Sequence, residues 1–448
     1  MRSRIAAGAV AATLISAVSC VLPATPATAA AGAGVSAGAA TGGSSVRADF
    51  NGDGVADLAV GSPDEDLTVG FGGAEVENGG AVNVIYGTRS AGLQAPKDQF
   101  WTQNSDGMAE EAEPNDRFGS ALAAGDFNGD RYSDLAVGVP FEGLAGAGDA
   151  EGVVHVIFGS KNGLTAAKNQ LWSQNSPGVG EESEYFDRFG SSLAVGNLGR
   201  SSHDDLAIGV PAEDVTVAGQ PVMDAGAVNV LYGSKTGLKA TTTDPVWTQQ
   251  TKGIAETAEP FDQFGSVLTI GDFGRSAHDD LAVSAPTEAS GPKGVHVVYG
   301  TSTGLDAKHS QWWTQASKDM RAEDECCDGF GLSLAAGNLG HSAHDDLAIG
   351  SPYEELGAAS QGSVNVIYGT KDGLRAAHNQ LWSQDSAGIA GSGESGDQFG
   401  YALAIGNFGK SGHEDLAIGV PYEDVHAVDD GGVNVIYGSA GGLTATGD

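Results

Sequence analysis

The sequence predicts an all-β fold, a six-bladed β-propeller built from four-stranded antiparallel blades. First, the tetrapeptide DLA[VI] recurs six times, starting at Asp57, Asp134, Asp205, Asp280, Asp346 and Asp415. Second, each copy contains short runs rich in Val, Ile, Tyr, Phe and Trp, separated by Gly and Pro and without helical periodicity, which indicates β-strands. Repeats of this kind bury their apolar faces by packing small sheets around an axis, and seven blades are a less favoured count.

Four runs in a fixed order predict the strands of each blade. The first follows a Phe-Gly pair at 118–119, 189–190, 264–265, 330–331 and 399–400. The second is DLA[VI] itself. The third has the pattern V-x-V-[IVL]-[YF]-G and covers 82–87, 154–159, 228–233, 295–300, 364–369 and 433–438. The fourth ends at a tryptophan followed by [TS]-Gln, at Trp101, Trp172, Trp247, Trp313 and Trp382. The second and third runs are nearly continuous in apolar residues, which predicts that both faces of each sheet are covered.

The two ends of the chain depart from the repeat. Residues 41–50 occupy the place of a first strand but lack its Phe and Leu, and the last copy stops at Asp448, before a tryptophan strand. We therefore expect shared strands to close the ring, with residues 30–44 as the candidate for completing the sixth blade.

The amino-terminal residues have the pattern of a secretory signal. Arg2 and Arg4 precede an apolar run, and Ala27-Thr28-Ala29 forms a cleavage site of the A-x-A type. We expect a signal peptide over 1–29, a flexible Ala/Gly-rich segment over 30–44 and the propeller over 45–448. The protein is then secreted. A lipoprotein signal that leaves a lipidated Cys20 at the cell surface is the less favoured alternative.

Composition narrows the classes of partner. The formal net charge is −36, from 22 Lys and Arg against 58 Asp and Glu. Nucleic acids and anionic membranes require clusters of basic residues, so neither is an expected partner. No later apolar stretch is long enough to span a membrane. Cys326 and Cys327 are adjacent, either as two thiols or as a vicinal disulfide, and the expected state is a monomer.

Taken in order, Phe-Gly, D-x-N-G-D-G-x-x-D-L, G-x-P and V-x-V-x-Y-G resemble the FG-GAP repeat, over essentially all of 45–448. The resemblance implies a propeller head like that of integrin alpha chains, calcium held in β-hairpin loops, and a role in binding or adhesion. The chain differs from integrins in its longer repeat, its six copies and its lack of their companion domains.

Two nine-residue loops have the ligand pattern of a calcium site. Positions 1, 3, 5 and 9 supply side-chain oxygens and position 7 a carbonyl, a donor set that water completes for Ca²⁺. The predicted ligands are Asp49, Asn51, Asp53, Val55 and Asp57 in the first loop and Asp126, Asn128, Asp130, Tyr132 and Asp134 in the second. Gly52 and Gly54 permit the tight backbone path. An Asx-rich turn without metal is the plain structural alternative.

The other four loops keep the length but replace the ligands. They cover 197–205, 272–280, 338–346 and 407–415, with Gly at position 3, Ser at position 5 and His at position 7. We expect the serine and histidine to hydrogen-bond the closing aspartate and the backbone donors of the loop, in place of a metal. Weak calcium binding and a histidine-based transition-metal site are the alternatives.

Further acids and tryptophans recur in nearly every blade. Each Phe-Gly follows a Glu-x-x-Asp, as at Glu113 and Asp116, and another acid follows each proline, as at Glu142. Because catalytic carboxylate pairs need two differently tuned groups in one cleft, their repetition favours a structural or cation-binding role. The tryptophans are expected to fill gaps between blades rather than to stack on sugars, and Trp312 is the best candidate for exposure.

The function expected from the sequence is a secreted calcium-binding propeller. It would act as a non-catalytic binding or adhesion module for an extracellular protein or carbohydrate. The alternative is a secreted hydrolase, glycan- or phospholipid-directed, built on the same propeller. An enzyme should carry one blade that breaks the pattern, and the ECCD stretch at 325–328 is the irregularity in question.

Overall fold

The structure is a computed structural model that describes residues 48–68, 75–144, 150–242, 244–287, 292–321, 327–356, 359–425 and 428–445. These residues form strands, turns and loops, with no helix, so the all-β prediction is confirmed. The same ranges contain no helix that could cross a membrane. The predicted signal peptide, the segment 30–44 and Cys20 lie outside the described residues.

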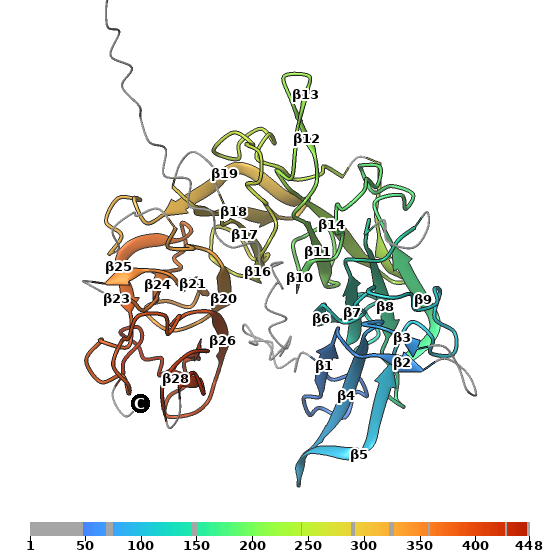
Figure 1. The fold of residues 1–448 in the computed structure, drawn as a ribbon, viewed down its shortest axis with the longest axis horizontal. Coiled ribbons are helices and arrows are strands. Elements are labelled where there is room, and N and C mark those ends of the chain that lie inside the picture. Colours follow the sequence, from blue (N-terminus) through green and yellow to red (C-terminus); the bar gives the residue numbers. More distant parts are fainter. Residues whose placement is uncertain are drawn as a thin grey trace, which may run out of the picture.

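Six antiparallel sheets follow one another around an axis, which confirms the six-bladed propeller (Figure 1). The first blade contains β1 (Leu58–Ser62), β4 (Ala81–Thr88) and β5 (Gly92–Trp101). The second contains β6 (Ala121–Gly125), β7 (Asp134–Val139), β8 (Val153–Phe158) and β9 (Thr165–Trp172). The third contains β10 (Ser192–Gly196), β11 (Asp205–Val210), β14 (Ala227–Ser234) and β15 (Gly237–Lys239).

The second half of the ring repeats this order. The fourth blade contains β16 (Leu268–Gly271), β17 (Asp280–Ala285), β18 (Gly294–Thr301) and β19 (Gly304–Thr314). The fifth contains β20 (Ser333–Gly337), β21 (Asp346–Ser351), β24 (Ser363–Tyr368) and β25 (Arg375–Trp382). The sixth contains β26 (Ala402–Gly406), β27 (Asp415–Val420) and β28 (Gly432–Ile436). Among the described residues, the first and last blades therefore have three strands each.

Three short hairpins extend from the blades. They are β2 (Leu67–Thr68) with β3 (Glu75–Val76), β12 (Val215–Val217) with β13 (Gln220–Val222), and β22 (Glu355–Leu356) with β23 (Ala359–Ser360). Each hairpin lies in the variable Gly-rich segment, between the DLA[VI] strand and the V-x-V-[IVL]-[YF]-G strand of its blade. The hairpin β12–β13 projects away from the ring (Figure 1).

The apolar cores lie between neighbouring blades. Val82, Val84 and Trp101 of the first blade pack with Phe118 and Val137 of the second in one buried cluster. The second strand of each interior blade is covered on both faces, and β7, β11, β17 and β21 are buried along their whole length. This explains why the DLA[VI] runs are continuously apolar instead of alternating.

The Phe-Gly pair sits where one blade meets the preceding one. Phe118 is fully buried, and Gly119 has a φ of 93°. A Cβ at Gly119 would lie 2.8 Å from the carbonyl oxygen of Ala81 and 2.9 Å from a methyl carbon of Val82. Only glycine allows both the left-handed conformation and this close approach to the first blade.

The repeated tryptophans pack in the blades, as predicted. Trp101, Trp247 and Trp313 are buried. Trp312, the candidate for exposure, is half-buried. Its ring is tilted against that of His296 with centroids 4.1 Å apart, and a Cβ at Gly294 would lie 2.3 Å from it, so a residue without a side chain makes room for the indole.

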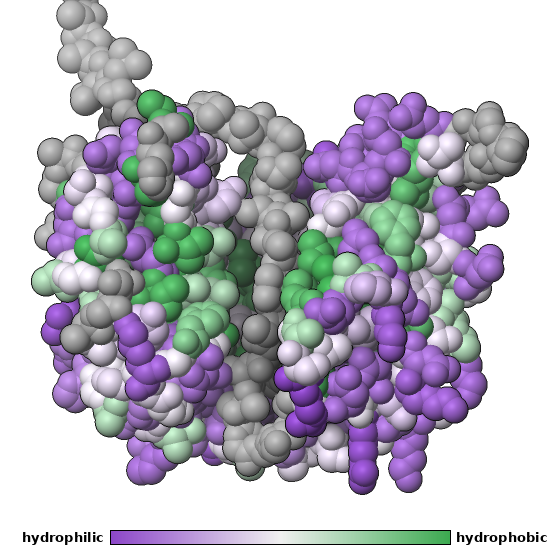
Figure 2. All heavy atoms as spheres, turned by 90° about the horizontal axis from the view of Figure 1, so that it is seen from below, coloured by the Kyte–Doolittle hydropathy of each residue, from purple (hydrophilic) through white to green (hydrophobic). Residues whose placement is uncertain are grey.

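Among the described residues, no blade follows the sixth to cover it in the way that the other blades are covered. The second residue of the nine-residue loop is fully buried in five blades, at Phe50, Phe127, Leu198, Phe273 and Leu339. Its counterpart Phe408 is 52% exposed. The first and last blades face each other at the bottom of Figure 1, and Figure 2, seen from that side, shows apolar patches on the described surface.

Candidate metal-binding loops

The closing aspartate has the same two hydrogen bonds in all six nine-residue loops. In the first loop, Asp57 Oδ2 accepts from the amide of Phe50 and Oδ1 from the amide of Gly87, both at 2.9 Å. The same pair of bonds is made by Asp134, Asp205, Asp280, Asp346 and Asp415. Position 9 therefore ties the loop to the third strand of its blade, whatever the loop's other residues are.

Burial has a strong effect on these carboxyl groups. Desolvation raises the pKa of Asp57 to about 6 and that of Asp134 to about 8, although the amides of Gly87 and Gly159 oppose the rise. In the fourth loop burial raises the pKa of Asp280 to about 9. A nearby cation would favour the ionised form of such a group.

In the first two loops the remaining oxygens turn toward the loop's own backbone. Asp49 accepts from the amides of Asp53 and Gly54 at 3.0 and 2.8 Å, and Asn51 Oδ1 accepts from the amide of Asp53 at 3.0 Å. Asp53 in turn accepts from the amide of Val55 at 2.9 Å. Gly52 and Gly54 have φ values of 70° and 77°, as the tight turn requires.

The second loop repeats this pattern. Asp126 accepts from the amides of Gly129, Asp130 and Arg131, Asn128 from that of Asp130, and Asp130 from that of Tyr132. All side-chain oxygens at positions 1, 3 and 5 thus gather around one turn in each loop. The aromatic ring of Tyr132 lies against Gly52, where a Cβ would approach it to 2.6 Å, so the two loops are packed against each other.

The donor set of both loops fits calcium, a hard cation that prefers carboxylate, amide and carbonyl oxygens. Asp49, Asn51, Asp53 and the Val55 carbonyl would hold it in the first loop, and Asp126, Asn128, Asp130 and the Tyr132 carbonyl in the second, with the closing aspartates Asp57 and Asp134. In the part of the chain that the structure describes, no three acidic, histidine or cysteine side chains converge closely enough to hold a metal.

The other four loops replace these interactions with a serine. The hydroxyl of Ser276 accepts from the amide of His278 at 2.9 Å and donates to the carbonyl of Gly300 at 2.9 Å. The equivalent bonds are made by Ser201, Ser342 and Ser411. The serine thus serves a backbone donor, as expected, but the predicted bond to the closing aspartate was wrong, because the one hydroxyl hydrogen of the serine is donated to a glycine carbonyl.

The histidines at position 7 face the preceding blade. His344 Nδ1 lies 3.2 Å from Oδ1 of Asp272, the first residue of the preceding loop. His203 covers Gly129 of the second loop, where a Cβ would lie 2.7 Å from Nε2. These histidines belong to different blades and do not gather around one point in the described residues.

The residue at position 8 makes hydrogen bonds that the sequence did not lead us to predict. Asp279 Oδ2 accepts from the amide of Asn197 at 2.8 Å, and its own amide donates to the carbonyl of Asn197 at 2.9 Å. Asp204, Asp345 and Glu414 make the same pair of bonds to position 1 of the preceding loop. We call this pair the loop clamp. In the sequence, the acid that follows each histidine was the signal that could have predicted this contact.

The Glu-x-x-Asp acids close a local turn, and the acids after each proline join neighbouring blades. Asp116 accepts from the amide of Glu113 at 2.5 Å, closing a tight turn. Glu142 accepts from the side chain of Gln103, in the preceding blade, at 2.5 Å. The side-chain pairs Gln174–Glu213, Gln315–Glu354 and Gln384–Glu423 repeat this bond.

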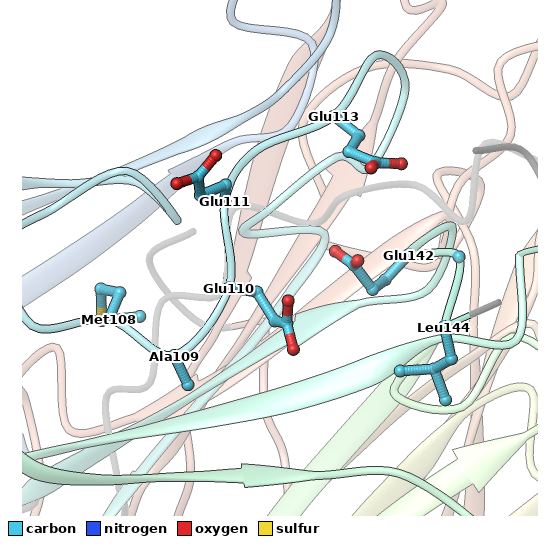
Figure 3. A pocket seen from close by; sticks show the side chains of 8 residues that line it. Met108, Ala109, Glu110, Glu111, Glu113, Glu142 and Leu144 are labelled. Carbon is cyan, nitrogen blue, oxygen red and sulfur yellow. The ribbon is translucent and has the colours of Figure 1, made fainter. Parts of the chain in front are cut away.

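An acidic pocket of about 590 Å³ lies beside this joint (Figure 3). Its lining includes Glu110, Glu111, Glu113 and Glu142, with Met108 and Leu144 at the sides. Burial and the charge of Asp116 raise the pKa of Glu142 to about 8. Glu213 is raised to about 8 for the same reasons in the next blade, so the arrangement is a property of the repeat and not one catalytic pair.

The irregular stretch at 325–328 lies partly outside the described residues. Cys327 and Asp328 are described, with Cys327 at a φ of 79°, whereas Glu325 and Cys326 are not. The vicinal disulfide and the cleft expected at this stretch stay predictions.

Comparison with known proteins agrees with this architecture. The FG-GAP repeat model matches residues 41–82 and 118–157. Phosphatidylinositol-glycan-specific phospholipase D of Rattus norvegicus is 28% identical over 187 residues, 41% of this chain and 21% of that protein. The Bos taurus protein of the same name is 35% identical over 187 residues, with the same coverage.

Integrin alpha chains are also related. Integrin alpha-PS2 of Drosophila melanogaster is 32% identical over 259 residues, which is 54% of this chain and 16% of that protein. The chain thus spans about a fifth of the length of the curated relatives it matches. The chain thus contains FG-GAP repeats, and its six blades with one shared loop geometry are consistent with a propeller like that of the integrin alpha chains it resembles.

Proposed function

We propose that the protein is a secreted propeller, stabilised by calcium in its first two loops, that acts as a non-catalytic binding module for an extracellular protein or carbohydrate. One observation carries the calcium assignment. Positions 1, 3 and 5 present only carboxylate and amide oxygens in two loops, while position 5 is a serine occupied by backbone bonds in the other four.

The binding role rests on the similarity to integrin alpha chains and on the bonds that the recurrent acids make. Integrin alpha chains share this propeller over 54% of the present chain in one case. Four of the recurrent acids, Glu142, Glu213, Glu354 and Glu423, accept the same glutamine bond between blades, which supports a structural role for them.

A secreted hydrolase is the second candidate, because relatives named as a phospholipase D match 41% of the chain. The match covers 21% of that protein, so the reacting groups of the relative need not lie in the shared part. Phospholipid and glycoside hydrolysis assays on the purified chain decide the matter. Turnover that survives repurification and is lost on substitution of one acid would replace the binding role.

Calcium titration of the secreted chain by calorimetry, paired with melting curves in EDTA, tests the metal assignment. We expect about two sites, and a melting temperature that rises with calcium because the folded state alone binds it. Each site should add ~2.7 kcal/mol to the free energy of unfolding at a hundredfold excess of calcium over Kd. Asp53→Ala and Asp130→Ala should each remove one site. Ser276→Ala, at the same position of a serine loop, should remove none.

Each other outcome is informative. Near six sites would show that the serine loops also bind calcium. An unchanged melting temperature in EDTA, with no heat of binding, would remove calcium from the proposal.

A further inference from the structure

The first ligand of each predicted calcium loop is held by a residue of the following blade. In the first loop, the amide of Asp49 donates to Oγ of Ser133 at 3.0 Å, and the amide of Ser133 donates to the carbonyl of Asp49 at 3.0 Å. In the second loop, the amide of Asp126 donates to Oδ2 of Asp204 at 2.9 Å, and the amide of Asp204 donates to the carbonyl of Asp126 at 3.2 Å. Each first ligand is thus fixed through both its N–H and its C=O.

The two contacts differ in charge. Ser133 and Asp204 occupy the same position 8 of successive loops, but the serine is neutral and the aspartate carries a carboxylate. This carboxylate lies against the residue that leads into the second loop, because a Cβ at Gly125 would be 2.8 Å from Oδ2 of Asp204. The first loop has a cation beside it instead, since the guanidinium of Arg89 donates to the carbonyl of Asp53 at 3.3 Å.

The fixed backbone belongs to the residue that also organises the turn. The carboxylate of Asp126 accepts from three amides of the second loop, those of Gly129, Asp130 and Arg131. Asp126 therefore connects the turn that carries the other proposed ligands to the third blade. Residues that orient a metal ligand from outside typically contribute 10- to 100-fold to metal affinity. A ligand that is already ordered also loses less conformational freedom when the metal binds.

We infer that the following blade sets the calcium affinity of each loop, with Ser133 and Asp204 as the positioning residues. Both hold the backbone of the first ligand, and Asp204 in addition places a negative charge beside the second loop. That charge attracts a divalent cation without coordinating it. The inference deepens the proposed function and rests on it, because it concerns the same two calcium loops.

Calorimetry with calcium tests the two loops one at a time. Asp53→Ala leaves the second site for measurement and Asp130→Ala leaves the first, so other differences between the loops stay constant within each series. Asp204→Ser, which gives the second loop the neutral contact of the first, should weaken its calcium binding about tenfold. Asp204→Asn keeps an acceptor and should lose less. Ser133→Asp should tighten the first site. Both effects of charge should shrink at high salt, which a hydrogen bond alone does not explain.

Asp279→Ser is the matched control. Asp279 makes the same pair of bonds to Asn197 of a serine loop, so its substitution should leave the calcium Kd of both sites unchanged. Melting curves in EDTA establish that the variants are folded. If Asp204→Ser does not fold, the gain expected of Ser133→Asp decides the matter.

The outcomes separate this inference from the calcium assignment. Two sites in the parent, with a Kd that neither Asp204→Ser nor Ser133→Asp changes, would overturn the inference and leave the calcium assignment intact. A lower melting temperature in EDTA with an unchanged Kd would show that Asp204 is a structural contact only, which also overturns it. No heat of binding in the parent would overturn both proposals.

Discussion

At the scale of the residue, the closing aspartate shows how one side chain serves loops of different chemistry. In every loop its two oxygens accept hydrogen bonds from two backbone amides, as those of Asp57 do in the first loop and those of Asp280 in the fourth. An ionised carboxylate in such a buried place is costly, and only its hydrogen bonds offset the loss of water. Aspartate at this position is therefore explained without a metal, and the difference between the loops lies in positions 3, 5 and 7.

Glu142 allows a prediction about pH. Its pKa rises from 4.5 in the unfolded chain to about 8 in the folded protein, chiefly by burial and secondly by the charge of Asp116. The folded state then holds more protons between these two values, so the free energy of unfolding falls as pH rises through that window. Glu142→Gln, which is neutral throughout, should match the parent near pH 5 and exceed its unfolding free energy by ~1–3 kcal/mol near pH 9.

Urea unfolding at both pH values measures this difference. Glu111→Gln, at an exposed acid of the same pocket, is the matched control and should change neither value. A parent that is more stable than Glu142→Gln at pH 9 would show that the ionised carboxylate is the favourable form in the folded state.

At the scale of the element, blades are joined by a small set of recurring bonds. The loop clamp connects position 8 of one loop to position 1 of the preceding one, and the Gln–Glu pairs connect the outer strand to the next blade. In the first loop position 8 is Ala56, which has no side-chain acceptor. The first loop therefore has no side chain at position 8 that could accept the backbone amide bond of a loop clamp.

The clamp can be tested at Asp279. Asp279→Ala leaves the amide of Asn197 without its acceptor, and an unmet donor at a partly buried joint costs ~1–3 kcal/mol of unfolding free energy. Asp279→Asn keeps an acceptor oxygen and should recover most of the loss. Asp98→Ala, on the exposed part of β5, should cost little. Equal stability of Asp279→Ala and Asp98→Ala, by urea unfolding, would mean that the clamp is not a stabilising contact.

At the scale of the whole molecule, much of the fold could be predicted because the repeat writes each strand six times. The FG, DLA[VI] and V-x-V-x-Y-G runs each fall at or beside the predicted strand, and the ten proposed ligands lie in two matching turns. The joints were not predictable. Whether Asp279 bonds its own loop or Asn197, and whether Trp312 faces water or His296, depends on how separate blades approach each other.

The exposed Phe408 of the sixth blade gives the final prediction. Phe273 and Phe408 occupy the same loop position, but Phe273 is fully buried under the fifth blade and Phe408 is 52% exposed. Phe273→Ala should therefore cost ~3–5 kcal/mol of unfolding free energy by leaving a cavity, whereas Phe408→Ala should cost less than ~1 kcal/mol.

Chemical unfolding of both variants at one pH and calcium concentration measures the contrast. Each variant is the control of the other, because both remove a phenylalanine from the same position of equivalent loops. Any difference in the free energy of unfolding then reports on how deeply the side chain is buried. Similar large costs would mean that another part of the protein, or a second copy, packs against the sixth blade in solution. A small cost at Phe408 alone means that this face of the sixth blade stays uncovered in the free protein.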